Sequence, residues 1–437
     1  MAQARHVQGE ARQRDVQARS TDARFCQVGA VARSGRSILT NLVSSDQAYE
    51  CAQTIEHVRQ RMQRAEHALL DAFEHHERAL GSAVQSKLDA DPADCLANLA
   101  NIANDFELLV RRKDCLASLA HSEMHLRRER LTKPHTSTYE WIFAKEASSP
   151  ARTDEAKRDV HFAEWLERGE GIYWITGKPG SGKSTLMKYI ANNPQTEALL
   201  RTWSGSSQLY IASHFFWLQG TSLQKSYEGL LRTIIYDILC RHPTLIKATC
   251  DTYWPWTDLN RRDNGSPPAW TSTELKRCLL TLMGAASRTS AGTAYFCFFL
   301  DGLDEYDGDK EDVIGLLRDL TRAKNIKICA SSRPWEIFRQ SFKSSVLADK
   351  ALVLHHYTKN DIDLVVSETV QPHLEIWKGN AGYLAQVNEV IEEIVQKAQG
   401  VFLWVVLVLQ QEVIPGLRFA DGVDMLRDRL ERVPPGR

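Results

Sequence analysis

Residues 171–190 read GIYWITGKPGSGKSTLMKYI, and this stretch decides the fold. Its centre, from Gly177 to Ser184, fits the pattern G-x-x-x-x-G-K-[S/T], which is typical of a loop that binds phosphate. The apolar residues GIYWIT before the loop predict a short buried strand, and STLMKYI after it predicts a helix. A strand, a glycine-rich loop and a helix in this order indicate the first unit of a parallel α/β nucleotide-binding domain.

The loop is expected to hold phosphate in two ways. Its glycines let consecutive backbone N–H groups face an anion, and the following helix adds the positive end of its dipole. Lys183 can reach the β- and γ-phosphates, and the Ser184 hydroxyl can ligate magnesium. The alternative, a glycine-rich turn with no ligand, leaves the flanking strand and helix unexplained. We predict nine nucleotide-binding residues: Gly177, Lys178, Pro179, Gly180, Ser181, Gly182, Lys183, Ser184 and Thr185.

A second motif, YFCFFLDGLDEYDGD at 295–309, offers the carboxylate that a magnesium site needs. Asp301 follows four apolar residues and ends a buried strand, at the edge where open α/β sheets bind their ligands. We expect Asp301 to hold Mg²⁺ together with Ser184. Asp304 and Glu305 follow on the loop, and one of them can orient or deprotonate an attacking water. The later acidic residues of the motif fit a solvated turn better.

Arg333 lies at the end of the next predicted strand, in ICASSRP at 328–334. It is expected to emerge at the same sheet edge as Asp301, where an arginine can sense or neutralise a γ-phosphate. The alternative is a surface arginine in a turn set by Pro334. We favour the functional role, which completes a predicted catalytic set of Lys183, Asp304, Glu305 and Arg333.

The segment YTKND at 357–361 resembles a guanine-reading [N/T]-K-x-D motif. GTPases combine that motif with D-x-x-G after the magnesium strand, whereas Gly, Leu and Asp follow Asp301 here. Thr358 also fits a helix N-cap, with Asp361 in the first turn. We therefore expect ATP or ADP, with GTP as the open alternative.

Strand and helix patterns alternate from about 160 to 355, which predicts an α/β domain with a five-stranded parallel sheet. The two flanking regions are helical in pattern: in the first, apolar residues from Cys51 to Leu69 follow a/d spacing, which favours an N-terminal hairpin or bundle. The run VFLWVVLVL at 401–409 predicts a fully buried helix. The expected organisation is a disordered tail at 1–40, a helical region at 41–132, a linker at 133–160, the nucleotide-binding core at 161–357 and a helical subdomain at 358–437.

Composition narrows the class of protein. The chain has 437 residues with a net charge of −1, so charge offers no reason to expect nucleic-acid binding. No apolar run approaches the roughly 20 residues that span a bilayer. The nine cysteines form no C-x-x-C pair, and several lie in apolar strands, as expected for reduced core thiols. We expect a cytoplasmic protein without a membrane span.

GIYWITGKPGSGKSTLMKYI, FFLDGLDE and ICASSRPW together resemble the NACHT domain of STAND-class P-loop NTPases, above all the fungal NOD-like-receptor-type proteins. The stretches SLAHSEMHLRRERLTKPHTSTYEWIF, HFFWLQGTSLQKSYEGLLRTIIYDIL and KAQGVFLWVVLVLQQ resemble the same group, so the similarity extends from about Leu116 to Pro435. It implies a nucleotide with Mg²⁺ held by Lys183, Ser184 and Asp301, with Asp304 or Glu305 near the attacking water and Arg333 as sensor. It also implies a switch between closed and oligomeric states.

The resemblance stops short at the C-terminus. Such proteins continue into a winged helix and a repeat array, and this sequence ends about where the winged helix would begin. The expected function is Mg²⁺-dependent nucleotide binding and slow hydrolysis as a signalling switch, with non-self recognition or programmed cell death as the setting. Self-association or a partner protein is expected to bind through the helical region. Two alternatives stay open: an oligomerising scaffold with a structural nucleotide, and, ranked last, a P-loop kinase.

Overall fold

The computed structural model describes residues 108–109, 111–144, 160–250, 269–289, 293–343, 351–374, 379–418 and 422–436. The chain divides into two compact units, Met1–Ala100 and Asn101–Arg437, and every described residue belongs to the second. The predicted tail at 1–40 and the a/d seam from Cys51 to Leu69 lie outside the described residues. The predicted domain boundaries therefore stay predictions.

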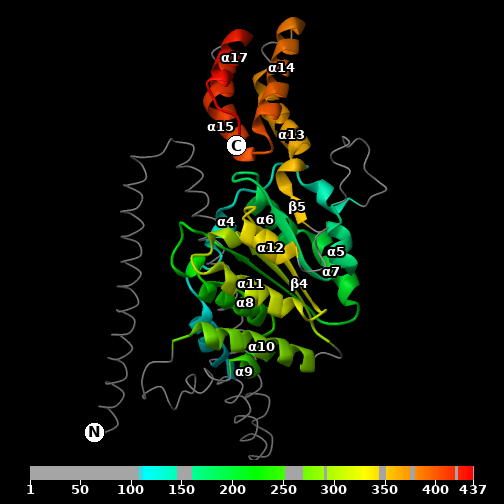
Figure 1. Cartoon of the computed structure of the whole chain (residues 1–437), viewed down its shortest axis with the longest axis vertical. Helices are drawn as coiled ribbons and strands as arrows, with labels where there is room; N and C mark the ends of the chain where they lie inside the picture. Colours follow the sequence, from blue (N-terminus) through cyan, green and yellow to red (C-terminus); the bar gives the residue numbers. More distant parts are fainter. Residues whose placement is uncertain are drawn as a thin grey trace, which may run out of the picture. The chain divides into compact units, whose positions relative to one another are not determined.

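Five parallel strands form one sheet, as the sequence predicted (Figure 1). Their order across the sheet is β2-β3-β4-β1-β5. The strands are β1 (Gly171–Thr176), β2 (Leu209–Phe215), β3 (Tyr295–Asp301), β4 (Ile326–Ser332) and β5 (Ala351–Val353). Nearly every residue of β1 to β4 is buried, because helices cover both faces of the sheet.

The strand register brings the motifs together. Thr176, the last residue of β1, pairs with Ser332, the last residue of β4, and Leu300 of β3 pairs with Ala330 of β4. Because all strands are parallel, the glycine-rich loop after β1, Asp301 at the end of β3 and Arg333 after β4 meet at one edge of the sheet. This topology is an α/β fold of the P-loop NTPase kind.

One face of the sheet packs on four helices through a large apolar core. The strands contribute aromatic and aliphatic side chains such as Trp174, Phe296 and Phe298. The helices are α8 (Tyr227–Arg241), α10 (Ser272–Thr289), α11 (Lys310–Thr321) and α12 (Glu336–Lys343). Cys115 and Leu119, in the helix at 111–119, join this core, so the segment before the sheet is packed against the domain.

The opposite face packs on α5 (Phe162–Arg168), α6 (Lys183–Asn192) and α7 (Pro194–Ser204). Tyr173, Ile175 and Phe299 point into this second core from the strands. A 3₁₀ turn at Glu140–Phe143 also belongs to it, within the segment predicted as linker. The remaining short elements are α4 (Leu126–Arg130), α9 (Ile246–Thr249) and 3₁₀ turns at Leu223–Lys225, Pro243–Leu245, Leu303–Glu305, Leu354–His356 and Gln371–His373.

The chain after the sheet is helical and has its own apolar core, which includes Val366, Ile394, Val405 and Leu430. Its elements are α13 (Lys359–Val370), α14 (Ala381–Ala398), α15 (Phe402–Val408), a π-helical turn (Leu409–Val413), α16 (Ile414–Arg418) and α17 (Val423–Glu431) (Figure 1). A separate core of this size supports the predicted C-terminal helical subdomain.

The prediction of a fully buried helix at 401–409 is wrong. Val401, Val405 and Val408 are buried, but Leu403 and Leu407 are 57% and 43% exposed. The helix packs on its neighbours along one side only. A continuous apolar run does not indicate which sides of a helix other elements will cover. The fifth strand is short, because β5 ends at Val353 and a 3₁₀ turn follows.

The described cysteines agree with reduced core thiols. Cys115, Cys250, Cys278, Cys297 and Cys329 are buried, Cys240 is exposed, and none of these six described cysteines forms a disulfide. Among the helices that the structure describes, none has the length and apolar character that crossing a membrane requires.

Candidate functional site

The glycine-rich loop has the curled backbone that its glycines permit. Gly180 and Gly182 have φ of +71° and +90°, in the left-handed region that other residues avoid. A Cβ at Gly182 would also lie 2.3 Å from the Tyr139 hydroxyl oxygen. The positive φ at both positions and the close approach of Tyr139 at the second are why these two residues are glycine.

Lys183 begins α6 and folds back over the loop. Its Nζ donates hydrogen bonds to the carbonyl oxygens of Gly177 at 2.8 Å and Lys178 at 2.9 Å. Burial lowers the pKa of Lys183, while the carboxylates of Asp304 and Asp301 act in the opposite direction. The ammonium therefore lies above the loop, within reach of a phosphate that the loop would hold.

Asp301 is placed as a magnesium ligand requires. It is 1% exposed, and its carboxylate accepts a hydrogen bond of 2.5 Å from the Ser331 hydroxyl. Burial raises the pKa of Asp301, and the nearby hydroxyls of Ser331 and Ser184 act against that rise. Ser331 also accepts a hydrogen bond from the Gly302 N–H at 2.9 Å, which fixes the turn after β3. Ser184 is thus near enough to Asp301 to lower the pKa of its carboxyl, and the two residues predicted to hold the metal lie close together.

Asp304 and Arg333 bind each other. Arg333 Nε lies 3.1 Å from Asp304 Oδ2, and the Arg333 backbone N–H donates to Asp304 Oδ1 at 2.9 Å. Asp304 is buried, whereas the Arg333 side chain is 46% exposed. Glu305 is held differently, because its carboxylate accepts the Leu218 N–H at 3.0 Å. All three predicted residues lie at the expected sheet edge, and each already has a protein partner.

Three buried polar atoms near the loop lack a hydrogen-bond partner among the described residues: Thr176 Oγ1, Ser181 Oγ and His355 Nδ1. A Cβ built on Gly177 would lie 3.0 Å from Ser181 Oγ and 3.4 Å from His355 Nδ1, so two of these atoms face the same small space. Burial and the charges of His356, Lys178 and Lys183 lower the pKa of His355 to about 4. The sequence analysis missed His355, and no motif signals it.

The C-terminal helices touch the phosphate-binding loop directly. Lys178 Nζ donates to the backbone and side-chain oxygens of Gln399, each at 3.2 Å. The Leu403 N–H donates to the Gly180 carbonyl at 3.1 Å. Gly400, between them, has a φ of +80°, and a Cβ there would lie 2.3 Å from the His355 carbonyl oxygen. The turn between α14 and α15 therefore lies against the loop.

The side chains of Thr358 and Asp361 in the TKND segment form hydrogen bonds to other parts of the protein. Thr358 stands at the N-cap position of α13, as expected, but its hydroxyl donates to Gly400 O at 3.3 Å and does not cap the helix. Asp361 accepts hydrogen bonds from Trp141 Nε1 at 2.8 Å and Tyr139 N at 3.2 Å. Burial raises the pKa of Asp361. Its carboxylate thus joins the segment before the sheet to α13, which leaves it poorly suited to read a base.

The donor set fits a magnesium ion that is bound together with phosphates. No cluster of three or more metal-ligating side chains occurs in the described part of the chain. One hydroxyl and one carboxylate, from Ser184 and Asp301, are what a Mg²⁺ site needs when water and phosphate oxygens complete the octahedron. The unpartnered Ser181 and Thr176 hydroxyls beside the loop are further groups that a polyphosphate could satisfy.

Residues 154–333 match the family described as "Nephrocystin 3, N-terminal". The matched span contains the glycine-rich loop, Asp301 and Arg333. No curated protein matches the chain. Among solved structures, the ORC2 protein of Aeropyrum pernix, determined as ADPNP and ADP complexes, overlaps 67% of this chain and 71% of its own, with 12% sequence identity and a TM-score of 0.34.

Proposed function

We propose that this protein is a Mg²⁺-dependent P-loop nucleotide-binding protein that hydrolyses ATP slowly and acts as a signalling switch of the NACHT type. One observation carries the nucleotide site: Ser184, at the start of α6, lies close to the buried Asp301, and both lie near the ammonium of Lys183. A hydroxyl, a carboxylate and an amine in this arrangement match the chemistry of a triphosphate with magnesium.

When bound, magnesium neutralises charge on the β- and γ-phosphates. The residues of this chain hold the phosphates and orient the groups that react. The loop amides and Lys183 bind the phosphates, while Ser331 and Gly302 hold Asp301 at the end of β3. A water that attacks phosphorus must be oriented by Asp304 or Glu305, and in this conformation both carboxylates have protein partners. One of these carboxylates must lose its protein partner before it can orient the water, and this extra step agrees with slow turnover.

The contacts between the loop and the C-terminal helices support a switch. Lys178 contacts Gln399, and Gly180 contacts Leu403, so both contacts involve residues of the loop itself. A nucleotide that changes the loop conformation must then change the free energy of these contacts. Different nucleotides would favour different positions of the C-terminal helices by the same coupling.

The test measures binding of fluorescent ATP and GTP analogues with Mg²⁺, followed by sizing of each bound state. The wild type is compared with Lys183→Ala and with Lys324→Ala, whose side chain is 85% exposed and remote from the loop. Loss of the lysine contact to phosphate should weaken ATP binding by roughly tenfold to a hundredfold. Lys324→Ala should bind like the wild type.

A nucleotide-dependent change in size would support the switch, and stronger binding of ATP than GTP would support the adenine preference. Equal binding by Lys183→Ala and wild type would refute the site. Binding without any change in size, together with unchanged turnover in Asp304→Asn and Glu305→Gln, would favour an oligomerising scaffold with a structural nucleotide.

A further inference from the structure

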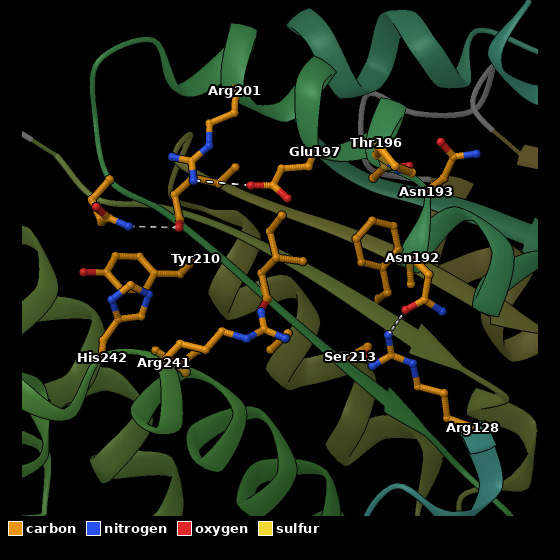
Figure 2. Close-up of a pocket in the computed structure, with 18 residues that line it drawn as sticks. Arg128, Asn192, Asn193, Thr196, Glu197, Arg201, Tyr210, Ser213, Arg241 and His242 are labelled. Carbon is orange, nitrogen blue, oxygen red and sulfur yellow. Dashed lines mark hydrogen bonds and ion pairs between the residues drawn. The ribbon is translucent and has the colours of Figure 1, made fainter. Parts of the chain in front are cut away.

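A cavity of about 590 Å³ lies along the free edge of strand β2 (Figure 2). Its lining comes from the end of α6 and the start of α7 on one side and from the end of α8 on the other. None of the lining residues belongs to the phosphate-binding loop. The volume is within the range of cavities that enclose a small molecule.

The lining is basic and rich in hydrogen-bond donors. Three arginines face it from three elements: Arg128 of α4, Arg201 of α7 and Arg241 of α8 (Figure 2). Arginine binds phosphate groups well because its planar guanidinium presents five N–H donors in a fixed fork. Asn192, which is hydrogen bonded to Arg128, and Asn193 add two amide side chains to the lining.

Protein contacts hold two of the arginines in place. Arg128 donates to the Ser213 hydroxyl at 2.8 Å and to the Asn192 side chain. Arg241 donates through Nη1 to the Ile211 carbonyl at 2.9 Å. Ile211 and Ser213 are two residues apart on β2, about 7 Å along a strand. The guanidinium groups of Arg128 and Arg241 are therefore oriented before any ligand binds, which lowers the entropic cost of binding.

The acidic groups nearby do not cancel this charge. Glu197 lines the cavity and lies 3.4 Å from Arg201, and both side chains are at least half exposed, so their mutual attraction is weak. Asp237, on α8, is buried and pairs with His125 at 3.3 Å. The positive charges of Arg241 and Arg128 also attract the Asp237 carboxylate. Three arginines and two carboxylates still leave a net positive charge around the cavity.

A buried hydroxyl in the lining lacks a partner. Thr196 is 2% exposed and lines the cavity, and its Oγ1 makes no hydrogen bond within the described chain. Leaving such a group unsatisfied is costly, and a ligand oxygen or hydroxyl would satisfy it. The Thr196 hydroxyl lies in the first turn of α7, where the helix dipole favours negative charge.

Side chains occupy part of the hydrogen-bonding edge of β2. In the parallel pairing of β2 with β3, the N–H and C=O groups of Leu209, Ile211 and Ser213 point to the free edge. Gln208 donates to the Leu209 carbonyl at 3.3 Å, and Arg241 donates to the Ile211 carbonyl at 2.9 Å. Side chains thus occupy two of the carbonyl groups that an added strand would use.

We propose that this cavity binds a small phosphorylated molecule, at a site separate from the phosphate-binding loop. The arginines supply the charge, the anchored guanidinium groups of Arg128 and Arg241 supply the orientation, and the Thr196 hydroxyl supplies a further hydrogen bond. The site is independent of the proposed ATPase, because no residue is shared between them.

The experiment uses the full chain with Lys183→Ala, which suppresses phosphate binding at the loop. Inorganic pyrophosphate is titrated by calorimetry at 0.15 M salt, and citrate is titrated in parallel. Arg241→Gln and Arg201→Gln are each added to this background. Arg322→Gln, whose side chain is 80% exposed outside the cavity, is the matched control. Circular dichroism and thermal melts verify that each variant is folded.

Saturable pyrophosphate binding that falls about tenfold or more in Arg241→Gln, and stays unchanged in Arg322→Gln, supports the site. Absence of saturable binding in the Lys183→Ala background overturns it. Equal losses in Arg241→Gln and Arg322→Gln also overturn it, because they indicate diffuse charge attraction. Citrate binding as tight as pyrophosphate refutes the phosphate specificity. None of these outcomes depends on whether the loop binds ATP.

Discussion

Protonation of the buried His214 should destabilise this fold in acid. His214 lies on β2, is 2% exposed, and has its Nδ1 atom 3.1 Å from Thr233 Oγ1. Because Thr233 donates its own proton to Gly229 O, it accepts from His214 Nδ1, which leaves Nε2 as the bare nitrogen. Nε2 is buried and has no partner among the described residues. A proton added there would place an unpaired charge in the core.

The magnitude follows from the pKa. Burial, with smaller contributions from His121 and His125, lowers the pKa of His214 from 6.5 to about 3. Between these pH values His214 is protonated in the unfolded chain but not in the folded chain. The free energy of unfolding therefore falls as pH falls from about 6.5 to about 3. A shift of about 3.5 units corresponds to about 5 kcal/mol over the whole window, and about 2.7 kcal/mol is lost by pH 4.5.

The test replaces His214 with Asn, whose amide can still donate to Thr233 but does not titrate. The smaller side chain should cost about 2 kcal/mol at pH 7.5. Urea unfolding from pH 7.5 to 4.5 at constant ionic strength should show this difference shrink and vanish near pH 5. Comparing the two proteins removes the opposite contributions of buried carboxylates such as Asp301, whose raised pKa favours the folded state in acid.

His373→Gln, at a partly exposed site, is the control and should keep the wild-type pH profile. A difference between His214→Asn and wild type that stays constant from pH 7.5 to 4.5 would refute the reasoning, because it would mean that His214 titrates normally in the folded protein.

Three further experiments test the loop contacts, the Asp304–Arg333 ion pair and a buried lysine. Gly400→Ala combines a φ of +80° with a Cβ 2.3 Å from His355 O and should cost about 3 kcal/mol in urea unfolding; a loss no larger than that of Gly205→Ala, where no atom lies within 4 Å, would contradict the close packing. Arg333→Ala and Asp304→Ala, alone and together, should give a coupling energy of about 1–2 kcal/mol in a double-mutant cycle, and additivity would argue against their ion pair. Lys327→Met should cost about 2 kcal/mol, because the buried Nζ donates to the Trp165 and Leu166 carbonyls and lies 4.0 Å from the Trp203 ring; an equal or higher urea midpoint would show that losing the buried charge outweighs losing those contacts.

Local sequence patterns were enough to predict the sheet and the curled glycine-rich loop. Glycines at positions that need a positive φ, continuous apolar strands and an aspartate at the end of the third strand are local features, and parallel topology brings their ends together. The predicted neighbours Ser184 and Asp301 therefore lie close together. The same reasoning failed for 401–409, because an apolar run is compatible with one buried face or with complete burial.

The sequence by itself determined the five-stranded parallel core and where its motifs meet, since strand pattern and glycine geometry act over a few residues. Only the tertiary structure decided which residues from distant segments reach the loop: Tyr139, His355 and Gln399 each arrive there through packing. It also decided that Arg333 binds Asp304 and that arginines of three helices line one cavity. Such contacts depend on how helices pack in three dimensions, and no periodicity along the chain encodes them.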